Sequence, residues 1–525
     1  MSEGLPGPTG IARVSAQLPL LAGQLAGAHG YRGVIGVGPM AWAETRLAYP
    51  ELELIELVRS GGTTERRARS TWTHRQIAWD PSGPKPPIAP ELLGASAVAV
   101  MLAAPDAAPS GSARASAGTT PAGGASGDAR LATLLDSAPL AIVVAPGAPD
   151  QLGSRLATLG VEPTLLGRAP GSNDDPTAQA AIAIIDRAVP AATAAPSSLR
   201  ILAVMTAYNE ADLIAPSIEG LLGAGLAVHV IDNWSTDGTF EVAERYRGAD
   251  GFELERFPDA PTPTYDWAPL LRRVETIGTA ARVDWGIHND ADERRTGPWP
   301  GVPVRDAIWR VQQSGFNAID HTRLDYRPID DAFVPGADFV AYFRHFEFGT
   351  TPDLRRLVKA WRNTGQRVDL AGTAGHEASF PGRRLFPYRF LLHHYPVRSQ
   401  AHGERKVLRE RQGRWNASER AKGWHVHYDA IAAGHTFVRP AGELIEYVEG
   451  RTEREFVVPI SSGVGLFPSG VPSWATGGPL QAAAYRGGRR LGGGSATQGL
   501  RAAVRSLPLV GRPARWAWRR LMGAR

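Results

Sequence analysis

The sequence contains no cysteine among its 525 residues. Disulfides, thiolate catalysis and cysteine-based zinc sites are therefore excluded. No uninterrupted apolar run reaches the roughly 18 residues that a membrane-spanning helix needs. The start, MSEGLPGPTG, has neither the basic region nor the apolar region of a signal peptide. We therefore expect residence in the cytoplasm.

Lysine is also scarce, because only four of the 57 basic residues are lysines: Lys85, Lys359, Lys406 and Lys422. Residues 481–525 hold ten arginines and no acid, so the net charge of +5 leaves −5 on the rest of the chain. That rest lacks the interleaved basic and aromatic pattern of a nucleic-acid binder, so nucleic acid is not an expected partner. The end, VRSLPLVGRPARWAWRRLMGAR, predicts either peripheral contact with the inner face of the membrane or a disordered basic tail broken by Pro508 and Pro513.

The length predicts two or three domains, because one hydrophobic core rarely serves so long a chain. We expect a first α/β domain over residues 1–188, in which the Pro/Gly/Ala/Ser-rich segment 103–130 forms a loop. A linker over 189–199 leads to a second α/β domain over 200–440. The last part, 441–525, is Gly/Pro-rich and predicted to be irregular.

Strand-like apolar runs alternate with helical patterns in both predicted domains. SAVAVML, LAIVVAP and AAIAIID predict strands of the first, and ILAVMTA, AVHVIDN, ARVDWGIHND and NAIDHTRLDY predict strands of the second. NEADLIAPSIEGLLGAGL predicts a helix between two of them. Such alternation is typical of parallel α/β sheets.

The run HNDADERR places Asp290 and Asp292 directly after a predicted strand. The spacing alone decides nothing, since the pairs Glu51/Glu53, Glu253/Glu255 and Glu453/Glu455 share it. In an extended strand, however, residues i and i+2 point to the same side. The strand would deliver both carboxylates to its carboxyl end, where open α/β sheets bind ligands. The runs TAYNE and VIDNWSTDGT should end at the same edge.

These three strand ends together resemble the opening of family 2 glycosyltransferases. In that family one strand ends in a Tyr-Asn-Glu turn, the next in Asp-x-x-Ser-x-Asp-Gly-Thr, and an Asp-x-Asp triplet follows. The elements here are Tyr208-Asn209-Glu210, the stretch from Asp232 to Thr239, and Asp290-Ala291-Asp292. The resemblance implies a GT-A fold, a Rossmann-like mixed sheet, for the second domain.

The same resemblance implies a nucleotide-sugar donor whose diphosphate is bridged by Mn²⁺ or Mg²⁺ acting as a Lewis acid. It assigns Tyr208 and Glu210 to the nucleobase and ribose pocket and Asp232 to a hydrogen bond with base or ribose. It makes Asp292 the main metal ligand, and Asp290 a residue that touches the ribose or the ion and takes part in catalysis. Asp237 has two possible interpretations: it takes part in the site, or its side chain stabilises the turn.

The segment 374–411 is rich in histidine and basic residues. By the same resemblance we take His394, rather than His393, as a further metal ligand. Arg398, Arg405 and Lys406 would face the leaving diphosphate. The alternative for His394 is a structural role. The alternative for the basic residues is a solvated helix face.

An inverting transferase needs a carboxylate base that deprotonates the acceptor hydroxyl. The resemblance places this acid between the triplet and the histidine strand, where Glu377 fits best in order. Asp338 and Glu347 are the alternates, and a structural salt bridge is the competing interpretation of Glu377.

The first domain resembles class I S-adenosylmethionine-dependent methyltransferases, beginning with HGYRGVIGVGPMAWAETRLAYPELELIELV. The glycine-rich turn departs from that family: it reads Gly36-Val37-Gly38-Pro39-Met40, without the leading acid and with Met at a glycine position. Glu56 lies where an acid that binds ribose is expected. We expect a degenerate, non-catalytic domain that does not bind S-adenosylmethionine.

The sequence thus predicts a metal-dependent inverting glycosyltransferase, with a second Rossmann-like domain in front, that acts on a glycan, lipid-linked or other hydroxyl acceptor. One alternative is a bifunctional methyltransferase and glycosyltransferase. The other is a non-catalytic scaffold that binds a nucleotide-sugar or a glycan.

Overall fold

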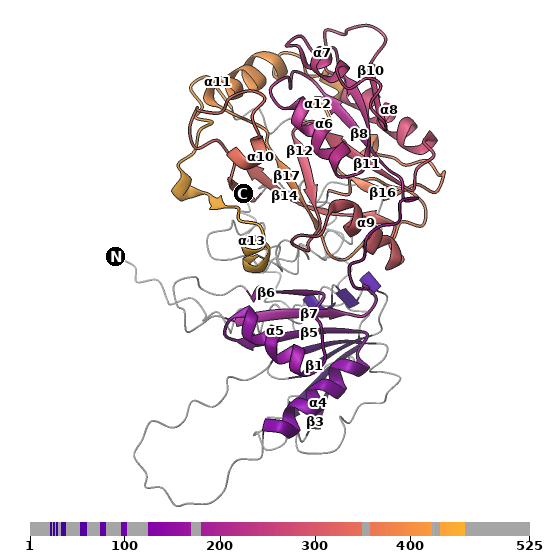
Figure 1. The fold of residues 1–525 in the computed structure, drawn as a ribbon, viewed down its shortest axis with the longest axis vertical. Helices are drawn as coiled ribbons and strands as arrows, with labels where there is room; N and C mark the ends of the chain where they lie inside the picture. Colours follow the sequence, from indigo (N-terminus) through magenta and orange to yellow (C-terminus); the bar gives the residue numbers. More distant parts are fainter. Residues whose placement is uncertain are drawn as a thin grey trace, which may run out of the picture.

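The computed structural model describes residues 124–169, 180–348, 357–422, Trp424 and 431–456. Before residue 102 it describes five short pieces: 21–29 with gaps at 24 and 27, 33–37, 53–59, 74–79 and 96–101. These residues form two α/β units, one above the other along the longest axis of the molecule (Figure 1). The basic tail and the glycine-rich turn after Val37 lie outside the described residues. Among the described residues, no helix combines the length and apolarity needed to cross a membrane.

The first unit is a seven-stranded sheet in the order β3-β2-β1-β4-β5-β7-β6. Its strands are β1 (Gly33–Val37), β2 (Glu53–Arg59), β3 (His74–Trp79), β4 (Ser96–Met101), β5 (Leu140–Pro146), β6 (Leu165–Ala169) and β7 (Ala180–Asp186). The strands are parallel except for β7, which runs antiparallel to both β5 and β6. The expectation of a parallel sheet therefore fails at this edge, and β3 and β6 were not predicted.

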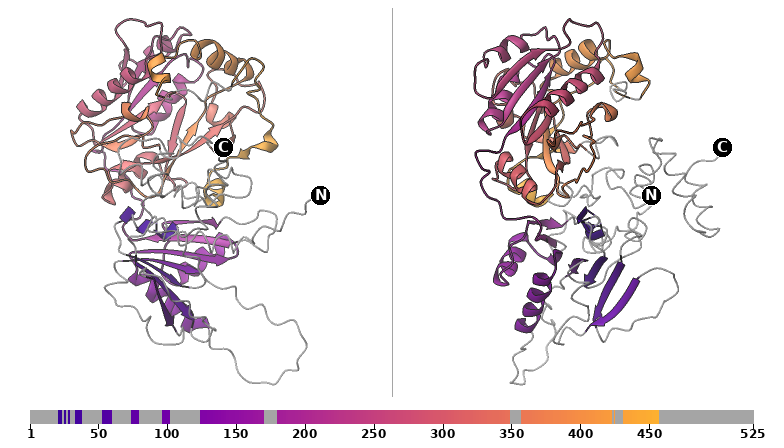
Figure 2. Two further views of the ribbon diagram at one scale, coloured as in Figure 1. Left: turned by 180° about the vertical axis from the view of Figure 1, so that it is seen from behind. Right: turned by 90° about the vertical axis from the view of Figure 1, so that its right-hand side faces the viewer.

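Two helices pack on this sheet, α4 (Gly124–Ser137) and α5 (Pro149–Thr158) (Figure 2). Alternate residues of β5 enter different cores: Ala141 and Val143 pack with the two helices, whereas Leu140 and Ile142 join a second core on the other face. Burial on both faces explains the continuous apolar run. The start of α4 at Gly124 corrects the predicted loop 103–130, because Ala, Arg and Leu after that glycine favour a helix.

The second unit contains a six-stranded sheet in the order β10-β9-β8-β11-β16-β13. Its strands are β8 (Ile201–Ala207), β9 (Ala227–Asp232), β10 (Phe252–Arg256), β11 (Trp285–Asp290), β13 (Ala318–Ile319) and β16 (Ala360–Arg362). The first four are mutually parallel, and β16 runs antiparallel to β11. The associated helices are α6 (Ile214–Gly223), α7 (Thr239–Glu244), α8 (Trp267–Ala280) and α9 (Val304–Gln313).

A five-stranded sheet completes this unit in the order β12-β17-β14-β15-β18. Its strands are β12 (Glu293–Thr296), β14 (His321–Tyr326), β15 (His345–Phe348), β17 (Phe390–His394) and β18 (Ile445–Glu446). The predicted boundary at residue 440 is therefore too early, because β18 pairs with β15. Short helices close the unit: α10 (Phe339–Tyr342), α11 (Gln400–Gly403), the π-helix η4 (Glu404–Arg411), α12 (Ala417–Arg420), α13 (Arg451–Glu455), and the 3₁₀ turns η3 (Ala371–Thr373) and η6 (Ala441–Glu443).

The two units share a core. Leu140 and Ile184 of the first sheet belong to the same buried cluster as Ile201, Trp285 and Phe386 of the second unit. The molecule is thus a mixed α/β protein in which the segment 187–199, which has neither helix nor strand, joins two packed units.

Candidate functional site

Three parallel strands of the second unit end at the same edge of the sheet. Register pairs Thr206 of β8 with Asp290 of β11, and Ala207 of β8 with Asp232 of β9. Glu210 follows the end of β8, Ser235 follows the end of β9, and Asp292 follows the end of β11. The structure therefore brings together the three motifs that the sequence spreads over about ninety residues. The other acidic pairs with the same spacing do not lie at these strand ends. Glu253 and Glu255 are on β10, and Glu453 and Glu455 are on α13. Glu51 of the third pair lies outside the described residues.

The turn after β8 is built from local hydrogen bonds. Asn209 adopts a left-handed conformation with φ of 55°. The Glu210 amide donates to Thr239 Oγ1 at 2.8 Å, and the Ala211 amide donates to Asp237 Oδ2 at 3.1 Å. Asp237 Oδ1 also accepts from the Thr239 amide at 3.0 Å. Asp237 therefore stabilises the turns that position Glu210, which is the turn-stabilising interpretation of this residue.

Arg398 binds both acids of this turn from inside the protein. It is 1% exposed. Its guanidinium donates to Asp212 Oδ2 from Nε at 2.9 Å, to Asp212 Oδ1 at 2.8 Å and to Glu210 Oε2. Burial raises the pKa of Asp212, but Arg398 outweighs this effect and the pKa lies below its ordinary value. A bidentate pair of this kind fixes the geometry of the turn.

Lys406 joins two of the three motifs. Its Nζ lies 2.7 Å from Glu210 Oε1 and 2.9 Å from Asp292 Oδ2, and the lysine is buried. Burial alone would raise the pKa of Asp292, but Lys406 and then His394 lower it well below its usual range. Asp292 is therefore ionised, and in this structure its charge is balanced by an ammonium group.

Asp290 is held differently from Asp292. Thr206 Oγ1 donates to its Oδ1 at 2.7 Å, and Lys359 Nζ donates to its Oδ2 at 2.7 Å. Lys359 also binds Glu293 Oε1 at 2.5 Å. Burial raises the pKa of Asp290, and Lys359 more than reverses this, so that the pKa lies well below the ordinary value. Both carboxylate oxygens of Asp290 are thus engaged by the protein.

The two neighbouring histidines of β17 have different partners. His393 is buried between Thr296 Oγ1 at 2.9 Å and the Tyr326 hydroxyl at 2.9 Å. His394 Nδ1 lies 2.7 Å from Asp325 Oδ1, and its Nε2 lies 3.9 Å from Asp292 Oδ2. Of these two histidines, His394 is therefore the one near the triplet, and His288 of β11 lies 3.6 Å from Asp290 Oδ1.

Asp232 is fully buried at the end of β9. Its Oδ2 accepts from the Ser235 amide at 3.1 Å and lies 3.7 Å from Arg256 Nε. Among the described residues its Oδ1 has no hydrogen-bond partner. Burial raises the pKa of this carboxyl above the ordinary value. A buried carboxylate oxygen without a partner is unfavourable unless a ligand completes it.

Tyr208, Glu377 and Arg405 each contact a charged partner within the protein. The Arg414 guanidinium lies 4.4 Å above the ring of Tyr208. Glu377 Oε1 accepts from Arg383 at 2.5 Å, and its backbone bridges Val358 next to Lys359. Arg405 is half exposed, and its Nε lies 3.3 Å from Glu410 Oε1.

The alternates for the base are also paired. Asp338 caps α10 by accepting from the Val340 and Ala341 amides. Glu347 accepts from Arg327 Nε at 2.8 Å.

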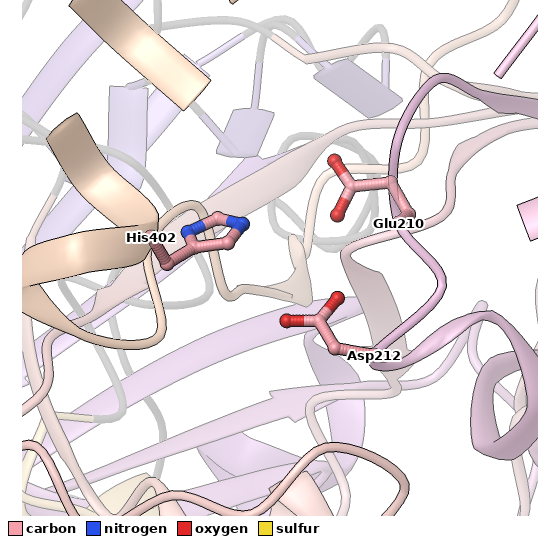
Figure 3. Close-up of side chains that lie close together, drawn as sticks. All are labelled: Glu210, Asp212 and His402. Atoms are coloured by element: carbon pink, nitrogen blue, oxygen red, sulfur yellow. The ribbon is translucent and has the colours of Figure 1, made fainter. Parts of the chain in front are cut away.

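Two groups of side chains could hold a divalent metal. Glu210, Asp212 and His402 each offer a ligand atom within 4.8 Å of the others (Figure 3). However, Arg398 already binds both of these acids. The second group is the pair Asp292 and His394; His394 contacts the Asp325 carboxylate through its other ring nitrogen, as ligating histidines commonly do, and Lys406 contacts Asp292. Asp290, with both oxygens engaged, does not fit as a ligand in this arrangement.

Sequence reasoning missed Asp212, Asp325 and Lys359. Asp212 and Asp325 carry no motif of their own. Lys359 had a signal that could have been used, because lysine is so rare in this chain that a lysine beside an apolar strand stands out.

No family model and no curated protein matches the sequence. Part of the fold is similar to crystal structures of TarS from S. aureus. The 1–349 fragment in complex with UDP matches at 16% identity and a TM-score of 0.19, over 27% of this chain and 39% of that chain. The fragment in complex with UDP-GlcNAc matches at 16% identity and a TM-score of 0.18, over 27% and 38%. The longer TarS structure matches at 16% and 0.21, over 31% and 28%. The matches thus cover well under half of these TarS chains, and the function must follow from the site itself.

Proposed function

We propose that the second unit transfers a sugar from a nucleotide-sugar donor to a hydroxyl acceptor on a glycan or lipid-linked molecule, with inversion. The observation that carries the proposal is the convergence of Glu210, Asp232 and Asp292 at one sheet edge beside the buried cations Arg398 and Lys406. Carboxylates beside cations suit a ligand that offers hydroxyl and N–H donors at one end and anionic oxygens at the other.

Asp232 supports recognition of the nucleoside. Its unpartnered Oδ1 would accept a hydrogen bond from a base N–H or a ribose hydroxyl. Tyr208, which lies under the Arg414 guanidinium, would offer an aromatic surface beside it. These roles match those that the sequence resemblance assigns.

Arg398 and Lys406 support stabilisation of the leaving diphosphate. Fixed cations near the position where charge develops lower the barrier most where water is excluded. A divalent ion, Mn²⁺ or Mg²⁺, would be held by Asp292 and His394 and, when bound, would act as a Lewis acid on the diphosphate. Asp290, fixed by Lys359 and Thr206, would orient the donor rather than ligate the ion.

Glu377 is the proposed base. It must accept the proton of the acceptor hydroxyl while that oxygen attacks the anomeric carbon in line. The adjoining Gly375 carbonyl lies 3.4 Å from His288 Nδ1, so the segment runs along the edge of the site. The Glu377 carboxylate pairs with Arg383 at 2.5 Å.

The test is a panel of uridine, guanosine and deoxythymidine diphosphate sugars with and without Mn²⁺, read first by thermal shift and then by turnover. A preferred donor stabilises the folded protein by mass action. Uridine diphosphate is the first product to test, since it is the ligand of one TarS structure. D292N should lower donor hydrolysis and transfer by about 100-fold or more. Unchanged turnover in D292N would refute the proposal.

The first unit favours a second candidate, the bifunctional enzyme, through its strand order. The order β3-β2-β1-β4-β5 reverses between β1 and β4, and ligands bind at such switch points. Glu56 is in register with Gly36 near the end of β1. We nevertheless propose a degenerate domain, and expect calorimetric titration of the full chain with S-adenosylmethionine to give no binding heat. Saturable heat would favour the bifunctional enzyme.

A further inference from the structure

Two of the four lysines of the chain are buried at this site. Lys359 is 5% and Lys406 4% exposed, and each contacts one aspartate of the Asp290-Ala291-Asp292 triplet. The other 53 basic residues are arginines. An ammonium group is a compact point charge on a flexible stem, whereas a guanidinium is a planar and rigid fork of donors.

The ammonium group of Lys406 contacts Asp292 Oδ2, the oxygen that a metal bound between Asp292 and His394 would use. Asp292 Oδ2 is 2.9 Å from Lys406 Nζ and 3.9 Å from His394 Nε2. The same Nζ is 2.7 Å from Glu210 Oε1, so it balances the charge of Glu210 as well. A divalent ion bound between Asp292 and His394 would meet this ammonium at close range in a buried place, where charge repulsion is strong.

Two features of Lys406 would allow its ammonium group to move away from Asp292. Lys406 lies in the π-helix η4, and π-helical turns occur frequently at functional sites. Its four-carbon stem is flexible, and a diphosphate would offer oxygens that compete with Asp292 for the ammonium. Lys359 also lies between two carboxylates, Asp290 and Glu293, but it directly precedes strand β16 instead of lying in a π-helix.

We infer that Lys406 is a built-in counter-ion that competes with a divalent metal for Asp292 and releases this carboxylate when a donor diphosphate binds. Metal and donor binding are then coupled, and each raises the affinity of the other by the same factor. The inference rests on the proposed function, since it takes the diphosphate to be that of the donor.

The first experiment measures Mn²⁺ binding to the full chain without nucleotide, by calorimetry and by the electron paramagnetic resonance signal of free Mn²⁺. K406M should bind Mn²⁺ at least about tenfold more tightly than the wild type. K422M is the matched control, because Lys422 is an exposed lysine beside Trp424, and it should bind like the wild type. The double variant D292N/K406M should lose the gain.

Equal Mn²⁺ affinity in K406M and the wild type would overturn the inference. If K406M does not fold, judged by circular dichroism, K406Q replaces it with a shorter neutral side chain and the same expectation. A gain that survives in D292N/K406M would place the metal elsewhere and would overturn the inference too.

The second experiment repeats the titration with uridine diphosphate, corrected for Mn²⁺ bound to the free nucleotide. The nucleotide should tighten Mn²⁺ binding to the wild type more than to K406M. No tightening in the wild type, or equal tightening in both proteins, would overturn the coupling. If no donor is turned over while K406M still gains Mn²⁺ affinity, the proposed function fails and the competition stands. If sugar is transferred but K406M gains nothing, only the inference fails.

Discussion

Lys359 illustrates how a single buried charge supports the site. Its ammonium group balances Asp290 and Glu293, and K359M would leave two carboxylates buried without that cation. Removing one partner of a buried ion pair costs about 3–5 kcal/mol. We expect this loss in the free energy of unfolding, measured by urea denaturation, with K422M unchanged. A loss below about 1 kcal/mol, the range of a solvent-exposed ion pair, would contradict this role of the lysine.

His393 predicts a pH dependence of stability. Burial, and then the charge of Arg294, lowers its pKa to about 3, whereas an unfolded histidine titrates near its ordinary value of 6.5. Between these values the unfolded chain binds the proton more readily, so the contribution of His393 to stability is complete above pH 6.5 and decreases as the pH falls towards 3. The decrease is about 1.4 kcal/mol per pH unit.

Unfolding free energies of the wild type and H393Q at pH 7 and pH 5 test this sign. H393Q keeps a polar side chain between Thr296 and Tyr326 but cannot titrate, so it should lose less stability on acidification. An identical pH slope in the two proteins would assign the acid sensitivity to His321 or His402, whose pKa values burial also lowers.

At the scale of elements, β11 packs closely against its neighbouring strand at a glycine. Trp361 of β16 lies against Gly286 of β11, and a Cβ at Gly286 would come 2.7 Å from Trp361 Cζ2. G286A should therefore cost about 1–3 kcal/mol and displace Asp290, four residues further on. Tm and Mn²⁺ or donor binding measure the two effects. G220A in α6 is the control, since a Cβ there meets nothing within 4 Å and should be neutral or stabilising. Equal Tm values for the two variants would contradict the packing argument.

The elements also show what a sequence can predict. Strand ends β8, β9 and β11 were predictable, because each is an apolar run that stops at a polar turn. The run NAIDHTRLDY predicts one strand but forms β13 and β14 in different sheets. Asp320 separates them: its Oδ1 accepts from the Leu357 amide, and Arg389 binds its Oδ2 at 3.0 Å. Such distant partners leave no local pattern.

The same limit applies to the site. Its acids were found because they follow strands, and His394 was distinguished from His393 by the resemblance. The sequence could not predict which basic residue pairs with which acid. Arg398 and Asp212 are 186 residues apart in the sequence, and Lys406 and Asp292 are 114 residues apart. Glu377 as base and the role of Arg405 stay predictions.

At the scale of the molecule, the two units are joined by buried polar contacts as well as by a shared core. The Tyr388 hydroxyl of the second unit donates to Asp186 Oδ2 of β7 at 2.6 Å. Trp299 Nε1 donates to the Thr164 carbonyl at 3.1 Å. Contacts that fix both sides of an interface make separate unfolding of the units unfavourable, so we expect one cooperative transition in calorimetry.

Y388F tests this coupling. Loss of a hydrogen bond to a buried carboxylate costs about 1.5–3 kcal/mol, so the single transition should move down by roughly 1–3 °C and stay single. Y246F is a matched control, because the Tyr246 hydroxyl donates to Glu219 at the same 2.6 Å but at an exposed position. It should change the stability by less than about 0.5 kcal/mol. Two separate transitions, of which Y388F moves only one, would show that the units unfold independently and that the first unit does not stabilise the second.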